Sequence, residues 1–479
     1  MAELFRNYIA GEWVTGTSAT PNRNPSDTGD VIGEYAQVDA EQARAAIAAA
    51  KRAFAAWSTG SIQERANILD RAGSEIIARK DELGALLSRE EGKTLPEGVG
   101  EAMRAGQIFR FFAGEVVRMT GDKLASVRPG VDVEVTREPL GVIGLITPWN
   151  FPIAMITRKV APALASGCTI VVKPAAETPL CALAIAKLGM DAGLPPGVLN
   201  VVTTTDAPAV GKVLCDDSRV RKLTFTGSTE VGKILYRQCA NTVKKLTLEL
   251  GGNAPFLVFD DANLDQAIAG AVASKYRNAG QTCVCANRIL VQSGIYDRFA
   301  AALVDAVKKL AVGPGMAPGT TLGPLITSEA VAKVEALVGD AVKRGAKVLI
   351  GGSLDKAGPL FYRPSVVGDV TPDMEIVREE IFGPVAALVR FDTEEDAIKL
   401  ANDTPFGLAA YLFSQNMSRA WRVAEKLDAG MVGVNEGIFS NEVVPFGGVK
   451  ESGLGREGAA EGLEEYLEIK YICLGGIDA

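Results

Sequence analysis

The sequence contains no histidine among its 479 residues. That absence excludes a Cys-His dyad, a Ser-His-Asp triad and any metal site that depends on histidine ligands. A cysteine nucleophile in this chain would have to be activated by a carboxylate, by backbone amides or by a bound cofactor.

The sequence also lacks an apolar run long enough to cross a membrane. The longest, residues 142–156, is interrupted by two prolines and an asparagine and falls short of the ~20 residues that a spanning helix needs. Residues 1–13 carry charges and no apolar run, so we expect no signal peptide. We therefore expect a cytoplasmic protein.

Neither charge nor cysteine content is unusual. The chain has 50 basic and 58 acidic residues, a formal net charge of −8, which argues against binding to nucleic acid or to an anionic membrane. Its seven cysteines are odd in number and scattered, which suits a reducing compartment better than a disulfide framework. Cys283 and Cys285 lack the C-x-x-C spacing of a redox or zinc motif.

Apolar strands alternate with helical patterns through the middle of the chain, which predicts an α/β fold. Such strands form a parallel sheet covered on both faces, and ligands bind at the carboxyl ends of the strands. We expect strands at 141–146, 169–172, 199–202, 222–226 and 245–250, and helices at 154–166, 179–193, 206–215 and 229–240.

A second α/β cycle begins after Gly251-Gly252. Two segments alternate apolar and polar residues, 131–136 and 466–473; the first is either a surface hairpin or an edge that pairs with another subunit. The remaining expected elements are strands at 7–9, 31–35, 254–259, 289–291, 348–350, 385–391 and 431–434, and helices at 40–57, 62–91, 96–118, 262–277, 294–310, 328–345, 394–401 and 417–428.

Residues 279–285 place Cys283 in a short polar segment between a helical pattern and an apolar strand. A thiol on such a loop can meet a ligand, because loops carry function more often than core elements do. Free cysteines are also among the most buried residues. The spacing alone therefore leaves open whether Cys283 is a nucleophile or a small apolar core residue.

Glu249 lies within an otherwise apolar strand that leads directly into two glycines. A buried carboxylate is costly unless it is partnered or functional, and burial raises its pKa toward a value useful to a general base. The alternative is a carboxylate satisfied by local amides. We favour the functional interpretation.

Three more motifs follow strands of the first predicted sheet. Asn150 could donate to an oxyanion, and Lys173 suits a ribose or a phosphate. Gly227 and Ser228 lie where a helix N-terminus can hold a phosphate, although the motif is neither G-x-G-x-x-G nor a P-loop. Taken singly, the Asn150 motif is better explained by a turn and the Gly227-Ser228 motif by a helix cap, and the alternative for Lys173 is a surface lysine.

Taken together, residues 5–475 resemble the aldehyde dehydrogenase superfamily. Six motifs occur in the family's order: Pro148-Trp149-Asn150-Phe151, Phe225-Thr226-Gly227-Ser228-Thr229, Leu248-Glu249-Leu250-Gly251-Gly252, Gly280-Gln281-Thr282-Cys283, Glu379-Glu380-Ile381-Phe382-Gly383-Pro384 and Pro445-Phe446-Gly447-Gly448. A narrower set resembles the NAD(P)-dependent succinate-semialdehyde dehydrogenases: Ala154-Met155-Ile156-Thr157-Arg158, the stretch Arg277 to Cys285, Ser440-Asn441-Glu442 and Gly453-Leu454-Gly455-Arg456-Glu457.

The resemblance implies a fold and a reaction. It implies a Rossmann-type cofactor domain (1–120 and 140–251), a catalytic domain (252–451) and oligomerisation elements (121–139 and 452–479). Cys283 would add to the aldehyde as nucleophile, Asn150 and the Cys283 amide would hold the oxyanion, and hydride transfer would leave a thioester. Glu249 would activate water as general base. No metal is needed.

The resemblance also assigns the cofactor. Gly227 and Ser228 would approach the pyrophosphate and Lys173 the adenosine ribose. Glu380 would hold the nicotinamide ribose, and Phe382 and Trp149 belong to the same site. Ala176 stands where NAD-preferring relatives tend to carry a glutamate for the 2′-hydroxyl, with Glu177 one position later. We therefore expect NADP, with NAD possible as a second cofactor.

Arg158, Arg277 and Ser440 would clamp the far carboxylate of a small acidic aldehyde, since arginine forks suit carboxylates. Structural ion pairs are the alternative for the arginines. We expect oxidation of succinate semialdehyde, or of glutarate or 2-oxoglutarate semialdehyde, by a homodimer or homotetramer. A Cys283–Cys285 bridge would be strained and would block catalysis, which makes Cys285 a redox-switch candidate.

Two other classes stay open at the level of sequence. One is a binding or structural protein that keeps the fold without activity. The other is a thiol acyltransferase or hydrolase without redox chemistry. Aldehyde-dependent formation of NADPH distinguishes the predicted dehydrogenase from both.

Overall fold

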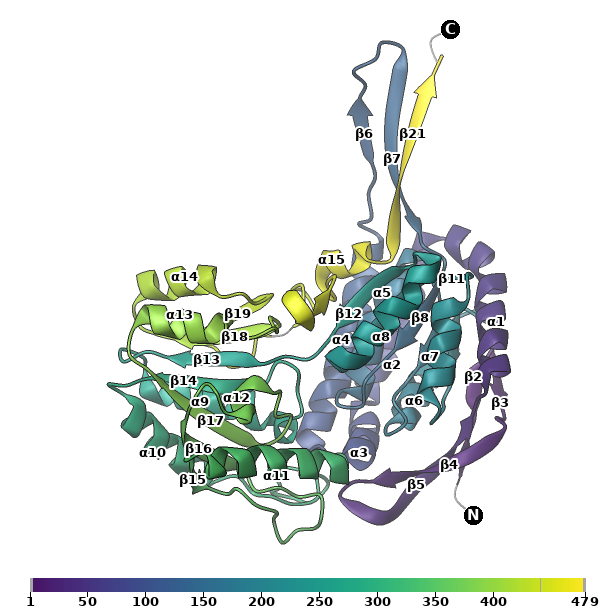
Figure 1. Cartoon of the computed structure of the whole chain (residues 1–479). Coiled ribbons are helices and arrows are strands. Elements are labelled where there is room, and N and C mark those ends of the chain that lie inside the picture. Colours follow the sequence, from purple (N-terminus) through teal and green to yellow (C-terminus); the bar gives the residue numbers. More distant parts are fainter. Residues whose placement is uncertain (1–2, 440, 477–479) are drawn as a thin grey trace.

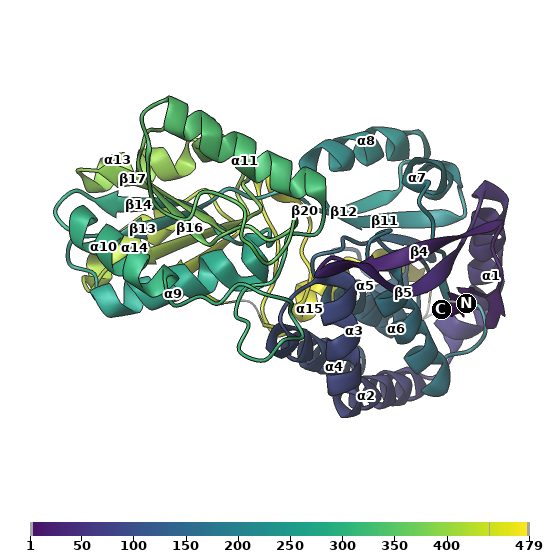
Figure 2. The same cartoon turned by 90° about the horizontal axis from the view of Figure 1, so that it is seen from below.

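The computed structural model describes residues 3–439 and 441–476. They form two α/β lobes side by side, with a three-stranded ribbon projecting from the body (Figure 1). Seen from below, β20 and β12 lie at the boundary between the lobes (Figure 2). The α/β fold class predicted from the sequence is confirmed.

The first lobe is built on an eight-stranded sheet whose five central strands are parallel. The order is β20 (Gly453–Leu454), β12 (Lys245–Glu249), β11 (Val220–Thr226), β8 (Val142–Ile146), β9 (Thr169–Lys173), β10 (Leu199–Val201), β2 (Asn7–Ile9) and β3 (Glu12–Val14). The chain builds outward from β8 in one direction through β9 and β10, and in the other through β11 and β12. The order therefore reverses between β8 and β11.

Helices cover both faces of this sheet and create two separate cores. Ile143 and Leu145 of β8 belong to one core, whereas Val142 and Ile146 belong to the other, as the two-residue period of a strand requires. The first core packs against α2 (Ile62–Ala78), α4 (Leu95–Val116), α5 (Pro152–Ser166) and α6 (Pro179–Asp191). The second packs against α1 (Ala40–Thr59), α7 (Ala207–Asp216) and α8 (Thr229–Cys239).

The prediction of a single helix over 62–91 is wrong, because this segment forms two helices. Arg79 leaves the helical region, with φ −104° and ψ 19°, and α3 (Lys80–Glu91) begins directly after it. Buried residues recur on both sides of the break, so the apolar period alone could not show it. α5 is buried along its whole length.

The second lobe contains a seven-stranded sheet that is parallel except for one edge strand. Its order is β15 (Lys347–Ile350), β16 (Ser365–Val370), β17 (Val385–Phe391), β14 (Ala286–Gln292), β13 (Ala254–Val258), β18 (Ala409–Phe413) and β19 (Met431–Val434). Its helices are α9 (Leu264–Tyr276), α10 (Tyr296–Val307), α11 (Ser328–Lys343), α12 (Glu375–Arg378), α13 (Glu394–Asn402) and α14 (Met417–Lys426). β16 and β18 were not predicted.

The two alternating segments of the sequence pair with each other in the projecting ribbon. β7 (Val131–Pro139) lies between β6 (Asp122–Ala125) and β21 (Leu467–Gly475), and both pairings are antiparallel. Leu124, Ile469 and Tyr471 are exposed on it. The predicted division into domains stays a prediction.

Shorter elements complete the chain. A three-stranded sheet of β1 (Leu4–Phe5), β5 (Asp27–Gln37) and β4 (Ser18–Asn24) was predicted only at residues 31–35. α15 (Ala459–Glu464) precedes β21, and single turns form η1 (Ala240–Thr242), η2 (Arg277–Gly280) and η3 (Lys450–Ser452). Within the described ranges, no helix combines the length and apolar character that crossing a bilayer requires.

Candidate active site

Three of the sequence motifs meet at the carboxyl edge of the first sheet. β8 leads into Trp149 and Asn150, and its neighbour β11 leads into Gly227. Glu249 ends β12 and pairs with Thr226 of β11. Since the strand order reverses between β8 and β11, this edge is the crevice in which open α/β sheets bind ligands.

The loop that carries Cys283 has an unusual backbone. Asn278 and Ala279 have φ values of 52° and 53°, in the left-handed region that side chains other than glycine rarely adopt. Gly280 follows with φ 76°, and a Cβ there would lie 2.2 Å from the Gly383 oxygen, so the close approach requires glycine. Strain of this kind collects at functional sites, where surrounding packing holds it in place.

Asn150 is held by this loop from both ends. Its side-chain Nδ2 donates to the Gln281 oxygen at 3.0 Å, and its backbone oxygen accepts from the Asn278 Nδ2 at 3.0 Å. A second donor to that oxygen is the buried Lys93 Nζ at 2.8 Å. A side-chain amide carries two N–H groups, so one donor of Asn150 remains for a ligand.

Cys283 lies on the wall of a pocket between the lobes. Helices α4 and α5 form the opposite wall, and the lining includes four cationic side chains. The lining residues are Lys93, Glu97, Gly100, Glu101, Arg104, Phe151, Ala154, Met155, Arg158, Arg277, Asn278, Thr282, Cys283, Val284, Ile438 and Phe446. A half-buried thiol beside arginines suits an acidic electrophile.

Two of the three predicted clamp residues lie in this pocket. The Arg158 guanidinium carbon lies 4.4 Å from the centre of the Phe446 ring, and that of Arg277 lies 5.5 Å from the centre of Phe151. Such contacts orient a guanidinium over the face of an aromatic ring. Among residues 3–439 and 441–476, Arg277 forms no ion pair. Ser440 lies outside the described residues.

Glu249 is fully buried, and neither of its carboxylate oxygens has a hydrogen-bond partner among the described residues. The alternative of a carboxylate satisfied by local amides therefore does not hold. Burial, and then the charge of Glu457, raises the pKa of Glu249 well above its ordinary value, while Lys159 and Arg158 oppose the shift. A carboxyl with a raised pKa is a stronger base once it has lost its proton.

A buried ion pair lies next to Glu249 and was not predicted. The Lys159 Nζ donates to the Thr226 Oγ1 and to Glu457, and all three side chains are buried. Lys159 comes from α5, whose other residues are almost all apolar. A lysine inside an apolar helix was therefore the available signal in the sequence.

The thiol of Cys283 is held in its neutral form. Burial raises its pKa to about 12, the carboxyls of Glu380 and Glu249 add to the shift, and Arg158 and Arg277 oppose it. Because the thiolate is the nucleophile, attack requires either a base that takes the thiol proton or an additional positive charge that lowers this pKa.

The predicted nicotinamide residues also lie together. The Glu380 Oε1 accepts a hydrogen bond from the Gly252 amide at 2.9 Å, and burial raises the pKa of Glu380 to about 7. A Cβ on Gly252 would lie 2.3 Å from the Cys283 oxygen, so this segment touches the nucleophile loop directly. The rings of Trp149 and Phe382 meet edge to face, 5.6 Å apart.

The predicted phosphate and ribose residues lie on the same edge of the sheet. Ser228 caps α8 by accepting a hydrogen bond from the Val231 amide, and the Gly227 amide donates to the main-chain oxygen of Glu249 at 3.0 Å. Lys173 ends β9 and is buried, which lowers its pKa, while Glu177 opposes that shift. A crevice at the reversal of strand order, a helix N-terminus and a buried lysine together fit a dinucleotide.

Cys285 differs from Cys283 in its surroundings. It is buried, its Sγ donates to the Lys275 oxygen at 3.4 Å, and burial raises its pKa. All seven cysteines are free. Cys285 is not part of the pocket wall, so it does not meet substrate in this structure.

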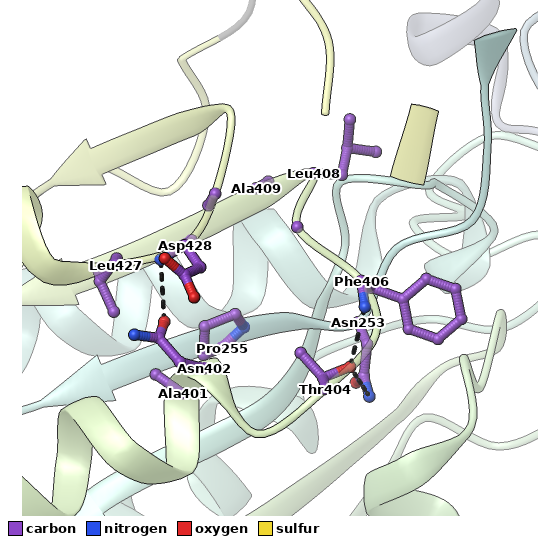
Figure 3. A pocket seen from close by; sticks show the side chains of 13 residues that line it. Asn253, Pro255, Ala401, Asn402, Thr404, Phe406, Leu408, Ala409, Leu427 and Asp428 are labelled. Carbon is purple, nitrogen blue, oxygen red and sulfur yellow. Dashed lines mark hydrogen bonds between the residues drawn. The ribbon is translucent and has the colours of Figure 1, made fainter. Parts of the chain in front are cut away.

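A second pocket, whose lining does not include Cys283, lies around Asn253, Asn402 and Thr404 (Figure 3). Its polar atoms are engaged internally. The Asn402 Oδ1 accepts from the Asp428 amide at 2.9 Å, and the Thr404 Oγ1 accepts from the Phe406 amide at 3.3 Å. No nucleophile or base that was predicted from the sequence lines it, and we place the chemistry in the Cys283 pocket.

Comparison with known proteins adds an independent line of evidence. The profile described as "Aldehyde dehydrogenase family" matches residues 13–472. A mitochondrial succinate-semialdehyde dehydrogenase of Arabidopsis thaliana is 54% identical over 99% of this chain and 90% of its own length. A glutarate-semialdehyde dehydrogenase of Pseudomonas aeruginosa is 50% identical over 99% of both chains. The crystal structure of an E. coli NADP-dependent enzyme superposes with a TM-score of 0.97, at 51% identity and covering 98% of both chains.

Proposed function

The chain belongs to the aldehyde dehydrogenase family, and on that premise we propose that it oxidises succinate semialdehyde to succinate with reduction of NADP. NAD serves as a second cofactor. The observation that carries the substrate assignment is the pocket in which Cys283 faces Arg158 and Arg277. NADPH absorbance, measured with succinate semialdehyde, a neutral aldehyde of equal length and each cofactor in turn, tests the proposal.

The residues of the pocket support each part of the reaction. The Cys283 thiol loses its proton to solvent, and the resulting thiolate adds to the aldehyde carbon. Asn150 and the Cys283 amide donate to the oxygen that becomes negative; losing one such donor typically costs ~10²–10³ in rate. Bound in the crevice, the nicotinamide cofactor supplies the acceptor for the hydride.

Release of the acid then falls to Glu249. The thioester carbon on Cys283 is attacked by water, and Glu249 takes the proton that the water loses. The carbon–sulfur bond breaks, the carboxylate leaves, and the Cys283 sulfur regains a proton. Neither carboxylate oxygen of Glu249 accepts a hydrogen bond from another described residue, so both oxygens remain available to the proton of that water.

Ala176 decides the choice of cofactor in this proposal. Its backbone oxygen accepts from the Tyr35 hydroxyl at 2.9 Å, which fixes the segment after Lys173. Replacing Ala176 with glutamate should lower the ratio of kcat/KM for NADP over NAD at least about tenfold, because a carboxylate repels the 2′-phosphate and accepts from the 2′-hydroxyl. Steady-state kinetics with both cofactors measure the ratio. Ala184→Glu, on α6, adds the same charge elsewhere; an equal change in that variant would contradict the assignment.

Arg277 tests the carboxylate clamp. Arg277→Ala should raise the KM for succinate semialdehyde about 10- to 100-fold, because a charge-assisted hydrogen bond to the substrate is lost. The KM for butanal, which has no carboxylate, should change less than about threefold. Arg110→Ala removes an arginine that forms an exposed ion pair with Asp70 and provides the control. Equal effects of Arg277→Ala on both aldehydes would refute the clamp.

Glutarate semialdehyde is the second candidate substrate. A relative with that name is nearly as similar to this chain as the succinate-semialdehyde dehydrogenase is, at 50% against 54% identity. Both aldehydes carry one terminal carboxylate, so the clamp alone does not separate them. Discrimination between the two semialdehydes depends on the depth of the pocket.

We also propose that the protein assembles as a homodimer or homotetramer in the cytoplasm. The support for assembly is the projecting ribbon, on which Leu124, Ile469 and Tyr471 are exposed although they are apolar or aromatic. Light scattering measures the mass, and cell fractionation the location. A monomeric mass at micromolar concentration would refute the first part.

Cys285 remains a proposed redox partner of Cys283. Peroxide would take two electrons from the two thiols, and their bridge would block the nucleophile. Dithiothreitol should then restore activity, and Cys285→Ala should make the loss harder to reverse. Activity that survives peroxide unchanged would rule the bridge out.

A further inference from the structure

We propose that Gly100 and Arg104 of α4 set the length of the acidic aldehyde that the pocket accepts. Gly100 leaves room for a longer chain, and Arg104 takes its carboxylate in exchange for Glu442. The enzyme would then oxidise the five-carbon ω-carboxylate aldehyde as well as the four-carbon one. The inference rests on the proposed function, since it assumes that the pocket binds acidic aldehydes.

One face of α4 forms a wall of the pocket. Glu97, Gly100, Glu101 and Arg104 all line it, at helix positions i, i+3, i+4 and i+7. Along that face three positions carry charged side chains and one carries none. The gap in the wall therefore falls at Gly100.

Nothing in the backbone requires glycine at this position. A Cβ on Gly100 would meet no atom within 4 Å, and its φ lies outside the left-handed region. By contrast, a Cβ on Gly98 would lie 2.5 Å from the Gly84 oxygen, and one on Gly106 would lie 2.6 Å from the Gly73 oxygen. Those two glycines allow α4 to pack closely on α3 and α2, whereas Gly100 is an exposed position of the pocket wall that leaves space for a side chain.

Depth along α4 is defined by its contacts with the catalytic loops. The Glu97 Oε1 accepts from the Asn278 amide at 2.8 Å, and the Glu101 Oε1 accepts from the Ile153 amide at 3.0 Å. Arg104 lies three residues further along the helix, a rise of about 4.5 Å beyond Glu101. It therefore offers a cation farther from the loops that hold Asn150 and Cys283.

Arg104 is paired, but with a partner that a substrate can replace. It forms an ion pair with Glu442, and the two side chains are 38% and 22% exposed. Ion pairs that reach solvent contribute little net stability. A substrate carboxylate offers the same two oxygens to the same fork, so the exchange of one carboxylate for another loses no hydrogen bond.

A purely structural latch is the competing explanation. Glu442 follows Ile438, which lines the pocket, so the ion pair could act only by holding this segment against α4. The two explanations predict opposite effects of removing Glu442 on activity with the longer aldehyde. If Arg104 binds substrate, removing Glu442 frees the arginine and helps the longer aldehyde; if the pair is a latch, removing either partner has the same effect.

The experiment compares kcat and KM for the semialdehydes of succinate, glutarate and adipate and for butanal, in the purified full chain. Arg104→Ala should lower kcat/KM for the five-carbon semialdehyde at least tenfold, mainly through KM, and for the four-carbon one less than threefold. Glu442→Gln should lower the KM for the five-carbon semialdehyde two- to fivefold. Gly100→Leu, which fills the gap, should reproduce the loss seen with Arg104→Ala.

Matched controls lie on the same helix. Arg110→Ala removes an arginine outside the pocket, and Gly114→Leu fills a second open glycine, whose Cβ would meet only Arg118 at 3.8 Å. Neither should change the ratio of five-carbon to four-carbon activity. A thermal unfolding scan of every variant shows that each is folded.

Two results would overturn the inference. One is an equal loss with every aldehyde in both Arg104→Ala and Glu442→Gln, which is the behaviour of a latch. The other is an unchanged five-carbon to four-carbon ratio in Arg104→Ala and Gly100→Leu while Arg277→Ala still weakens acidic aldehydes selectively; the proposed function would then stand without this inference. If the native enzyme does not distinguish acidic aldehydes from butanal, the proposed function fails as well.

Discussion

Replacing Cys283 with alanine should lower kcat for succinate semialdehyde by about 10⁴-fold or more, because the pocket lining offers no other thiol to form the thioester. The polar lining residues other than Cys283 offer carboxylates, cations, the Asn278 amide and the Thr282 hydroxyl, and no second thiol. Cys285 cannot substitute, since it is buried outside the pocket wall. NADPH formation followed at high enzyme concentration measures the residual rate.

The same variant should remain folded and should still bind cofactor. Cys283 is half-buried, so its loss removes little packing, and the residues proposed to hold the dinucleotide lie on the first sheet. Cys473→Ala replaces an exposed cysteine of β21 and should keep full activity. Residual activity of more than about one per cent in Cys283→Ala would contradict the covalent mechanism.

Replacing Glu249 with glutamine should separate the two halves of the reaction. We expect the steady-state rate to fall about 10²–10⁴-fold, because the thioester persists without a base to activate water. The first turnover should still produce close to one NADPH per active site, seen as a burst in stopped-flow absorbance. Glutamine keeps the shape of the buried side chain.

The pH dependence follows from the same carboxyl. Burial raises the pKa of Glu249, and the base acts only after losing its proton, so the steady-state rate of the native enzyme should rise with pH through that raised pKa. The rise should disappear in Glu249→Gln. A variant with no burst would show that Glu249 also takes the proton of Cys283, and a variant with the native rate would remove Glu249 from the mechanism.

The first sheet was predicted well because the same local pattern, an apolar strand followed by a helix, repeats along the chain. Each strand from β8 to β12 is apolar and is followed by a helix, and the structure ends most of them within two residues of the predicted limits. β16 was not predicted because Gly368 and Asp369 interrupt its apolar run, and Asp369 has a φ of 55°. β4 was not predicted because it is polar and contains Pro21; a proline is tolerated there because β4 is an edge strand.

For the site, the predictable part is the set of residues at strand ends and in the Cys283 loop. The pocket brings Cys283, Arg158 and Arg277 together as expected, although their catalytic roles stay predictions. Lys93, Gly100 and Arg104 were missed because they lie more than 150 residues before Cys283; Lys93 is in the short segment before α4, and the other two are on α4, which has an ordinary amphipathic pattern. Only the packing of α4 on α5 shows which face meets the pocket.

The backbone contacts around Cys283 divide the site into a part that tolerates change and a part that does not. Gly252 and Gly280 approach neighbouring main chain so closely that no side chain fits, which ties the nucleophile loop to two other segments through atoms common to every amino acid. On the α4 wall, by contrast, a Cβ on Gly100 would meet no atom within 4 Å, and Arg104 pairs only with the side chain of Glu442 among the described residues. New specificities can therefore evolve through single codon changes along one helix, while the reaction they serve is inherited intact.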